Sequence, residues 1–473
     1  MPRGPRRRPV SARRSAIEEL LARLGEIEPY RIRGRVRSCR GTLLVCGGLA
    51  GMVGLGDTCL IEPRGHNRHE YSWPEAGDPE PLLGEVVAVD DAGVHLLPFS
   101  ELEGVGLDAR VTLVRGLDRV RPTLGWLGRV LDPLARPLDD GPTPEWGPAA
   151  YPLHARPAAA HRRRGLGPRL DLGVRALNLF TPCCRGQRMG IFAGSGVGKS
   201  TLLAMLARHG NADALVLGPI GERGREVNAL LHDALGEAGL ARSAVVVATS
   251  DMPAMLRRRA AYLTLSIAEA LRDQGLAVLC LIDSVTRFAM ALREIYLAAG
   301  EPPTSKGYPP SVFAELPRLL ERAGPGISEG SITGLFTVLV EGDDLSDPVA
   351  DAVRAILDGH VVLDRRIAEG GRFPAVDVLR SLSRSAPDAY RPEERPLVER
   401  ARRLIRAYAE TAELIQLGAY RRGSDPLIDA AISARPALEA VLSQSIEERS
   451  ALGDDFARLA AAVGAAEAEA AGA

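Results

Sequence analysis

The chain has 473 residues, enough for two to four domains with a large buried core. Its 59 basic and 60 acidic residues give a net charge of −1, and only 4% of its residues are aromatic. These values argue against a specific nucleic-acid partner, which would need a basic, base-stacking surface. The six cysteines form no CxxC pair and the histidines show no zinc-ligand spacing, so we expect a reduced protein without structural zinc.

Residues 1–29 are predicted to be a basic arm followed by an amphipathic helix. Six arginines, with prolines between them, lie in residues 1–14. In residues 15–24, Ile17, Leu20, Leu21 and Leu24 recur at helical spacing. This helix either packs on its own domain or docks a partner, with the basic arm favouring an acidic protein or membrane surface.

Residues 30–100 are predicted to form a small β-barrel. Short apolar runs at 42–45, 58–61, 84–89 and 94–97 are separated by Gly, Asp and Pro, and the polar stretch 66–81 is expected to be a loop. The uncharged stretch 41–56 is shorter than the roughly 20 residues of a transmembrane helix and is rich in glycine. We therefore expect no transmembrane segment.

Residues 101–385 are predicted to form an α/β domain, because strands and helices alternate from Leu124 onward. We expect strands at 189–193, 214–217, 244–248, 277–282, 333–340 and 361–363, with helices at 200–208, 225–235, 255–273 and 348–357. Such alternation indicates a parallel sheet covered on both faces, with ligands at the carboxyl ends of the strands. Residues 386–473 are predicted to be a helical C-terminal domain, with helices at 392–417, 425–435 and 437–471.

A glycine-rich turn joins the strand at 189–193 to the helix that follows it. The turn and its flanks comprise Ala193, Gly194, Ser195, Gly196, Val197, Gly198, Lys199, Ser200 and Thr201. Strand, Gly-rich turn, Lys, Ser and helix in this order are typical of the phosphate-binding loop, although Ala193 replaces the first glycine of the strict pattern. Backbone N–H groups and the helix N-terminus would bind phosphate, Lys199 would contact the β- and γ-phosphates of ATP, and Ser200 would hold Mg²⁺.

Lysine is almost absent from the chain. Only Lys199 and Lys306 occur, and arginine supplies the remaining positive charge. An ammonium is a compact point charge, whereas a guanidinium is a planar fork. The two lysines therefore mark positions where compactness is expected to matter.

Two carboxylates follow predicted strands of the sheet. Asp283 ends the apolar strand 277–282 and is the expected magnesium ligand, with a helix N-cap as the alternative. Glu222 lies shortly after the strand 214–217 and is a candidate general base. From spacing alone, Glu226 and Glu237 remain alternatives to Glu222.

Several segments together resemble the type III protein-export ATPases, and most of all the flagellar export ATPases, which are related to the catalytic subunit of rotary ATP synthases. The segments are AGSGVGKST (193–201), GERGRE (221–226), CLIDSVTRFAMALREI (280–295), GEPPTSKGYPPSVFAELPRLLERAG (300–324), VLVEGDD (338–344) and RFPAVDVLRSLSR (372–384). The resemblance is close over residues 120–385 and looser on both sides. It implies a RecA-like P-loop domain between a small β-barrel and a helical C-terminal domain.

The resemblance also implies roles for individual residues. Glu222 matches the glutamate that polarises the attacking water, and Arg223 matches a residue near the γ-phosphate. Arg384 matches an arginine finger that enters the site of a neighbouring subunit. Phe373 matches an aromatic residue that lies against the adenine ring. Without the resemblance, Arg384 would be an ordinary surface arginine and Phe373 a core aromatic.

The loop 300–310 contains four prolines, with Lys306 and Tyr308 in its middle. In the family it resembles, this region faces the central channel of a ring. Lys306 would then contact a substrate or a central stalk protein. The alternative is a rigid loop whose lysine is only solvated.

For the whole chain, the resemblance implies a cytoplasmic ATPase that forms a homohexamer and associates peripherally with the inner membrane at the export apparatus. ATP hydrolysis would drive the release and unfolding of export substrates, together with their chaperones, at the export gate formed by membrane proteins. A stator-like regulator would bind the N-terminal helix. We favour the flagellum over the virulence injectisome.

Three other functions share parts of this pattern. A catalytic subunit of a proton-coupled rotary synthase has the same core, but the arginine-rich arm and the GYPP loop argue against it. A hexameric RNA translocase would need an aromatic, basic β-domain, which residues 30–100 lack. A non-catalytic nucleotide-binding scaffold would not need Glu222.

Overall fold

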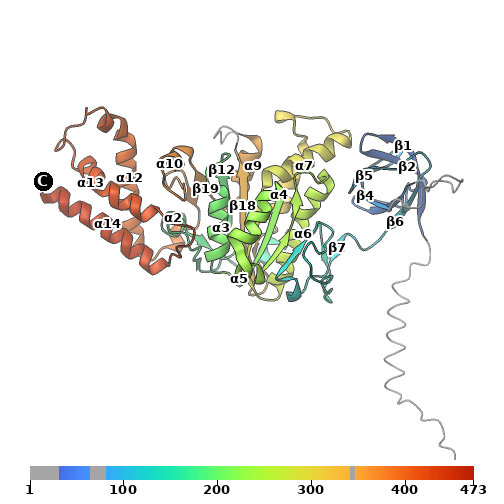
Figure 1. Ribbon diagram of the computed structural model, residues 1–473, viewed down its shortest axis with the longest axis horizontal. Helices are drawn as coiled ribbons and strands as arrows, with labels where there is room; N and C mark the ends of the chain where they lie inside the picture. The colour runs from blue at the N-terminus through green and yellow to red at the C-terminus, as the bar shows by residue number, and fades with distance from the viewer. Residues whose placement is uncertain (1–30, 64–80, 341–346, 473) are drawn as a thin grey trace, which may run out of the picture. The chain divides into compact units, whose positions relative to one another are not determined.

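The computed structural model describes residues 31–63, 81–340 and 347–472, and the chain divides into two compact units, 1–115 and 116–473 (Figure 1). The predicted basic arm and the helix at 15–24 lie outside the described residues, as does nearly all of the predicted loop 66–81. Among the helices in the described ranges, none is long and apolar enough to cross a membrane.

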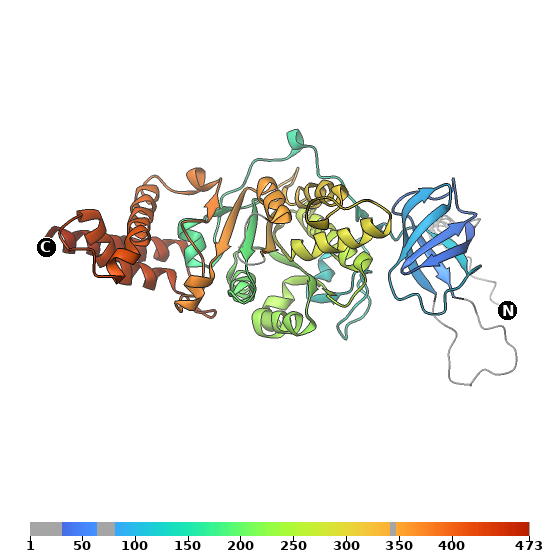
Figure 2. The same ribbon diagram turned by 90° about the horizontal axis from the view of Figure 1, so that it is seen from above.

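The first unit contains a closed β-barrel with the strand order β1-β2-β5-β4-β3-β6 (Figure 2). Its strands are β1 (Arg33–Arg40), β2 (Leu43–Gly47), β3 (Thr58–Glu62), β4 (Leu82–Asp90), β5 (Gly93–Pro98) and β6 (Arg110–Val114). Alternate side chains point inward and form a separate apolar core that includes Val36, Leu44, Ile61, Leu96 and Val111. The predicted barrel is therefore confirmed.

The predicted end of the barrel domain at residue 100 is wrong. Strand β6 pairs antiparallel with both β1 and β3, so the barrel is open without it. The sequence hides β6 because it has five residues and follows a loop that contains Gly104, Gly106 and Asp108. Strand β1 was equally hidden, because Val36 is the one fully buried apolar side chain among its exposed arginines.

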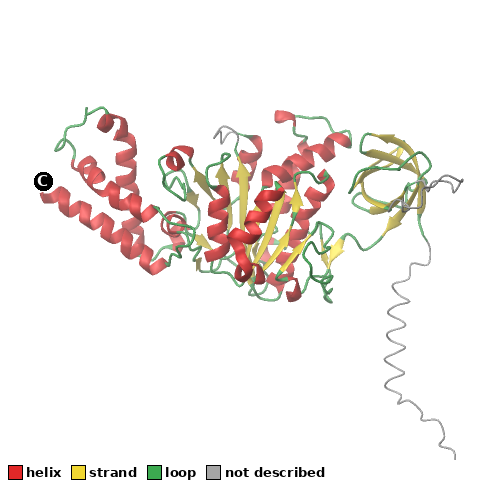
Figure 3. Cartoon of the chain, viewed as in Figure 1, coloured by secondary structure: helices red, strands yellow, loops and turns green. Residues whose placement is uncertain are grey.

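The second unit is built on a mainly parallel sheet with the strand order β20-β19-β12-β18-β16-β13-β14-β8 (Figure 3). Its strands are β8 (Arg129–Leu131), β12 (Arg188–Ala193), β13 (Ala214–Glu222), β14 (Ser243–Val246), β16 (Ala277–Asp283), β18 (Ser331–Leu339), β19 (Gly359–Leu363) and β20 (Leu382–Ser383). All six predicted strands are present, which confirms the α/β fold class. The edge strands β8 and β20 are two or three residues long and were missed.

Helices cover both faces of this sheet, because side chains of its strands alternate between two apolar cores. Met189 and Ile191 of β12 belong to the core that contains α3 (Lys199–His209), whereas Phe192 belongs to the other. The second core is formed by α6 (Ala254–Asp273), α7 (Val285–Ala298), α8 (Pro310–Leu320) and α9 (Pro348–Ile356). The sheet is thus buried on both faces, which is why its strands are continuously apolar.

The C-terminal region is helical, as predicted, with α12 (Glu394–Gln416), α13 (Pro426–Leu442) and α14 (Leu452–Gly472). The predicted break at Pro436 is wrong, because α13 continues through this proline and buries Ala434 and Leu438 on either side of it. The break instead falls at residues 443–451, where side chains and backbone form hydrogen bonds to other segments of the second unit. Tertiary contacts therefore override the local cost of proline.

Candidate active site

The phosphate loop has the backbone that its sequence predicts. Strand β12 ends at Ala193 and α3 begins at Lys199. Gly198 adopts φ +95°, a conformation that side chains with a Cβ strongly disfavour. The N-cap residue of α3 is Gly198, which has no side chain to cap the helix. Its first N–H groups are thus available to an anion, and the helix dipole favours negative charge there.

Lys199 brings the carboxyl ends of three strands together. It follows β12, while Glu222 ends β13 and Asp283 ends β16. Its Nζ lies 3.1 Å from Glu222 Oε1 and also donates to Asp283 Oδ1. Thr337 Oγ1 donates to the same Asp283 oxygen at 2.6 Å. Parallel strands whose ends meet at one edge thus gather the predicted cation and both predicted carboxylates.

The carboxyl group of Glu222 is unusual because it is buried next to a second carboxylate. Burial and the charge of Asp283 raise its pKa to about 7, although Lys199 opposes this shift. Burial alone would lower the pKa of Lys199, but Asp283 and Glu222 outweigh it and raise that pKa. At neutral pH Lys199 is therefore charged, and Glu222 is poised between its two forms.

Glycine at position 221 fixes the direction of Glu222. Gly221 adopts φ +69°, and a Cβ on it would lie 2.8 Å from the Cβ of Arg287 on α7. The positive φ and this close approach each disfavour any residue with a side chain at position 221. The turn that places Glu222 beside Lys199 thus depends on Gly221.

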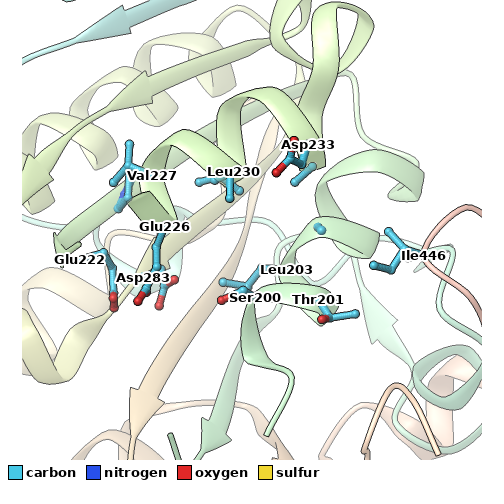
Figure 4. A pocket seen from close by; sticks show the side chains of 14 residues that line it. Ser200, Thr201, Leu203, Glu222, Glu226, Val227, Leu230, Asp233, Asp283 and Ile446 are labelled. Carbon is cyan, nitrogen blue, oxygen red and sulfur yellow. The ribbon is translucent and has the colours of Figure 1, made fainter. Parts of the chain in front are cut away.

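A cavity of about 230 Å³ lies beside these groups (Figure 4). It is lined by residues that include Ser200, Thr201, Leu203, Glu222, Glu226, Leu230, Asp233, Asp283 and Ile446. The Ser200 hydroxyl and the Asp283 carboxylate both face this space, and hydroxyl and carboxylate oxygens are the ligands that Mg²⁺ prefers. Arg223, by contrast, is exposed at the N-cap of α4 (Gly224–Ala229) and is not among the residues that line the cavity.

Phe373 lies against the phosphate loop. A Cβ on Gly198 would stand 3.4 Å from its ring, and 41% of Phe373 remains exposed. Because a core aromatic would be buried, this exposure disfavours the core alternative and leaves a ring face for a planar ligand.

Ile446 was missed by the sequence analysis. It lies in the segment 443–451 between α13 and α14, and its carbonyl oxygen is 2.7 Å from His209 Nε2 at the end of α3. An isolated isoleucine in a polar stretch gives no signal of its place. Only the fold brings it to the cavity.

Arg384 lies at the opposite end of the sheet from the phosphate loop. Ser383 of β20 pairs with Gly359 of β19, which pairs with Met189 of β12, so Arg384 is about level with Arg188. The strand from Arg188 to Ala193 separates it from the loop by about 17 Å. Arg384 is exposed and, among the described residues, forms no ion pair. It cannot reach the phosphate loop of its own chain.

The two residues predicted in the middle of the loop 300–310, Lys306 and Tyr308, lie in different environments. Lys306 is exposed and its Nζ lies 3.5 Å from Asp347 Oδ2. Tyr308 is buried; its ring centroid lies 6.1 Å from that of Phe313 and 5.4 Å from the guanidinium carbon of Arg293. The ring of Tyr308 is part of the apolar core, so of these two predicted pore-loop residues Lys306 is the one whose side chain is exposed.

A parallel sheet that ends in a phosphate loop beside two carboxylates defines a P-loop nucleoside triphosphatase. Residues 173–383 match the nucleotide-binding domain of the ATP synthase alpha/beta family, and residues 390–461 match the T3SS EscN ATPase C-terminal domain. The chain belongs to the family of flagellum-specific ATP synthases and type III secretion ATPases, and it is an ATPase of type III protein export.

Relatives of known name match over nearly the whole chain. The "Flagellum-specific ATP synthase" of Caulobacter vibrioides is 52% identical over 451 residues, which cover 94% of this chain and 98% of that protein. The protein of the same name from Salmonella typhimurium is 44% identical, covering 92% and 94%. The "Type 3 secretion system ATPase" of Xanthomonas euvesicatoria is 45% identical, covering 92% and 95%.

Solved structures show the same fold. The assembled ATPase EscN from the enteropathogenic E. coli type III secretion system matches with a TM-score of 0.83 at 39% identity, over 91% of this chain and all of that one. EscN in complex with its central stalk EscO matches with a TM-score of 0.81 at 38% identity.

The raised pKa of Glu222 predicts a pH dependence. Its carboxylate form is the one that accepts a proton, so kcat/KM for ATP should rise with pH through about 7. The profile would be measured at saturating Mg²⁺, so that the nucleotide itself does not titrate. A flat profile between pH 5.5 and 8.5 would contradict the assignment.

Proposed function

We propose that the chain hydrolyses ATP with Mg²⁺ at the interface of two subunits of a homohexamer, and that this drives flagellar protein export. The observation that carries the proposal is the meeting of Lys199, Glu222 and Asp283 at the end of the phosphate loop. A cation for phosphate, a carboxylate for a metal and a buried base are the groups that this reaction needs.

ATP would bind with its phosphates on the N–H groups of residues 195–200. Lys199 would leave Asp283 and contact the β- and γ-phosphates, while Thr201 lines the same cavity. The exposed face of Phe373 would receive the adenine ring, with Ile446 on the cavity wall.

Ser200 and Asp283 would hold Mg²⁺. Two protein ligands are enough, because phosphates and waters commonly supply the other ligands of this ion. When bound, the ion would neutralise charge that develops on the phosphate oxygens. Thr337, which bonds Asp283, would keep that carboxylate in place.

Glu222 would orient the attacking water and accept its proton. A pKa of about 7 matches this task, because a base is most effective when it titrates near the working pH. Arg223 is the neighbouring residue and would approach the γ-phosphate if its exposed side chain turned toward the site.

Arg384 would act on the nucleotide of a neighbouring subunit. It is exposed and about 17 Å from its own phosphate loop, so a contribution to catalysis has to come in trans. An arginine that stabilises transition-state charge is worth about 10³ to 10⁵ in rate. A closed ring gives every site one such arginine.

The further partners follow from the family. We propose a central stalk protein that contacts the Lys306 loop, a stator-like regulator at the N-terminal helix, and export-gate membrane proteins, chaperones and substrates. The location would be the cytoplasm, at the inner membrane. The relative EscN, solved in complex with its central stalk EscO, supports the stalk.

Virulence secretion is the second candidate. The Xanthomonas secretion ATPase is as similar as the Salmonella flagellar protein, at 45% and 44% identity. The 52% identity to the Caulobacter flagellar protein favours the flagellum. If deletion of the gene abolishes motility and leaves the secretion of effectors intact, the flagellar function is the correct one. The match to the EscN C-terminal domain disfavours the rotary synthase.

Glu222→Gln is expected to keep ATP binding and to lose hydrolysis by about 10²-fold or more, because the base is removed while the shape of the site stays. Binding would be followed with a fluorescent ATP analogue and turnover by phosphate release. Glu237→Gln is the control, since Glu237 is exposed and lies outside the cavity lining. Normal turnover in the Glu222 variant would remove the residue from this role.

Mixed rings test the arginine finger. Rings of Arg384→Ala subunits alone should keep only a small residual rate, lower by about 10³-fold or more, and rings of Lys199→Ala subunits alone should also lose most activity. Mixtures of the two should recover part of the activity. Recovery is expected because some interfaces then join an intact phosphate loop to an intact Arg384. If no mixing ratio restores turnover, Arg384 does not act in trans.

A further inference from the structure

The segment that carries Arg384 is held by a buried glutamine at the base of the phosphate-loop strand. Gln187 has no exposed surface and directly precedes β12. Its Nε2 donates to Ser383 Oγ at 3.0 Å and lies 3.5 Å from the carbonyl oxygen of Asp358. The same Asp358 oxygen accepts the backbone N–H of Arg384 at 2.9 Å.

The other atoms of Gln187 fix its amide in place. Its Oε1 accepts the N–H of Cys184 at 2.8 Å, and its carbonyl oxygen accepts the N–H of Gly334 on β18 at 3.0 Å. Asp358 is likewise fixed, because Arg188 binds its carboxylate through Nε and Nη2. A buried polar group whose donors and acceptors are all hydrogen-bonded specifies one arrangement of the segments it joins.

This arrangement fixes the position of β20, the strand that directly precedes Arg384. β20 has two residues, and its register on β19 rests on Gly359 opposite Ser383 and His360 opposite Leu382. So short an edge strand gives little hold of its own, since edge strands are paired on one side only. The hydroxyl of Ser383 adds a side-chain anchor directly next to Arg384.

Resting on the proposed role of Arg384, we propose that Gln187 and Ser383 are positioning residues for this arginine. Their hydrogen bond fixes the backbone of the finger to the foot of β12, the strand that leads to the phosphate loop of the same chain. Each subunit then holds its donated arginine and its own phosphate loop in one rigid frame. Neither Gln187 nor Ser383 is among the residues that line the cavity beside Lys199.

The test is a double-mutant cycle of Ser383→Ala and Arg384→Ala. Ser383→Ala removes the hydroxyl that accepts from the Gln187 amide, with little change in volume. We expect kcat to fall by on the order of tenfold, as for the loss of one hydrogen bond, with KM for ATP unchanged. In the Arg384→Ala background, Ser383→Ala should cause no further loss, because the group it positions is gone.

The matched control is Ser381→Ala. Ser381 is as buried as Ser383, at 2% and 3% exposure, and its hydroxyl also forms buried hydrogen bonds, to Val362 N–H and the Asp377 carbonyl. Neither of these two hydrogen bonds involves Gln187. The thermal unfolding midpoint of the Ser381→Ala protein should fall as much as that of the Ser383→Ala protein. The kcat of Ser381→Ala, by contrast, should stay within about twofold of wild type. Gln187→Met, which breaks the contact from the other side, should repeat the kcat effect.

The outcomes separate this inference from the proposed function. If Arg384→Ala keeps full activity, the finger itself is wrong. If Arg384→Ala loses activity but Ser383→Ala does not, the positioning role is overturned while the finger stands. A Ser383→Ala loss that multiplies with that of Arg384→Ala would also overturn it, because it would show an effect that does not pass through Arg384.

Discussion

The active site depends on one buried ammonium group placed between two carboxylates. Lys199 begins the helix that follows β12, and Glu222 and Asp283 end the neighbouring strands β13 and β16, which β18 separates from β12. None of the three side chains is largely exposed. Two buried carboxylates repel each other, so the lysine charge is what allows both to stay there. Nucleotide phosphates and a metal ion can take over the same charges, which lets this arrangement bind ATP and then act on it.

The two ends of β12 serve different sites. Its carboxyl end carries the phosphate loop, and its amino end, through Gln187 and Arg188, holds the segment of Arg384. The length of the strand keeps the arginine away from its own loop. On this account each subunit has both the phosphate loop and Arg384, but at opposite ends of the sheet. A catalytic site is complete only when a neighbouring subunit supplies its Arg384.

The sequence predicted what local chemistry determines. The glycines, Lys199 and the apolar strands that end in carboxylates gave the sheet and the central cluster, because each depends on neighbours in the chain. The register of β20, the closure of the barrel by β6 and the position of Ile446 depend on distant pairing. The same holds for Pro436, whose helix continues because of packing, and for Tyr308, whose ring is buried by residues of other elements.

The most direct test is the ATPase rate as a function of protein concentration, with the size of the particle measured with and without ATP and Mg²⁺. If catalysis takes place between subunits, specific activity should climb steeply as a hexamer-sized species forms. Full activity from a strictly monomeric protein would contradict the account, because the distance to Arg384 leaves no arginine finger within one chain.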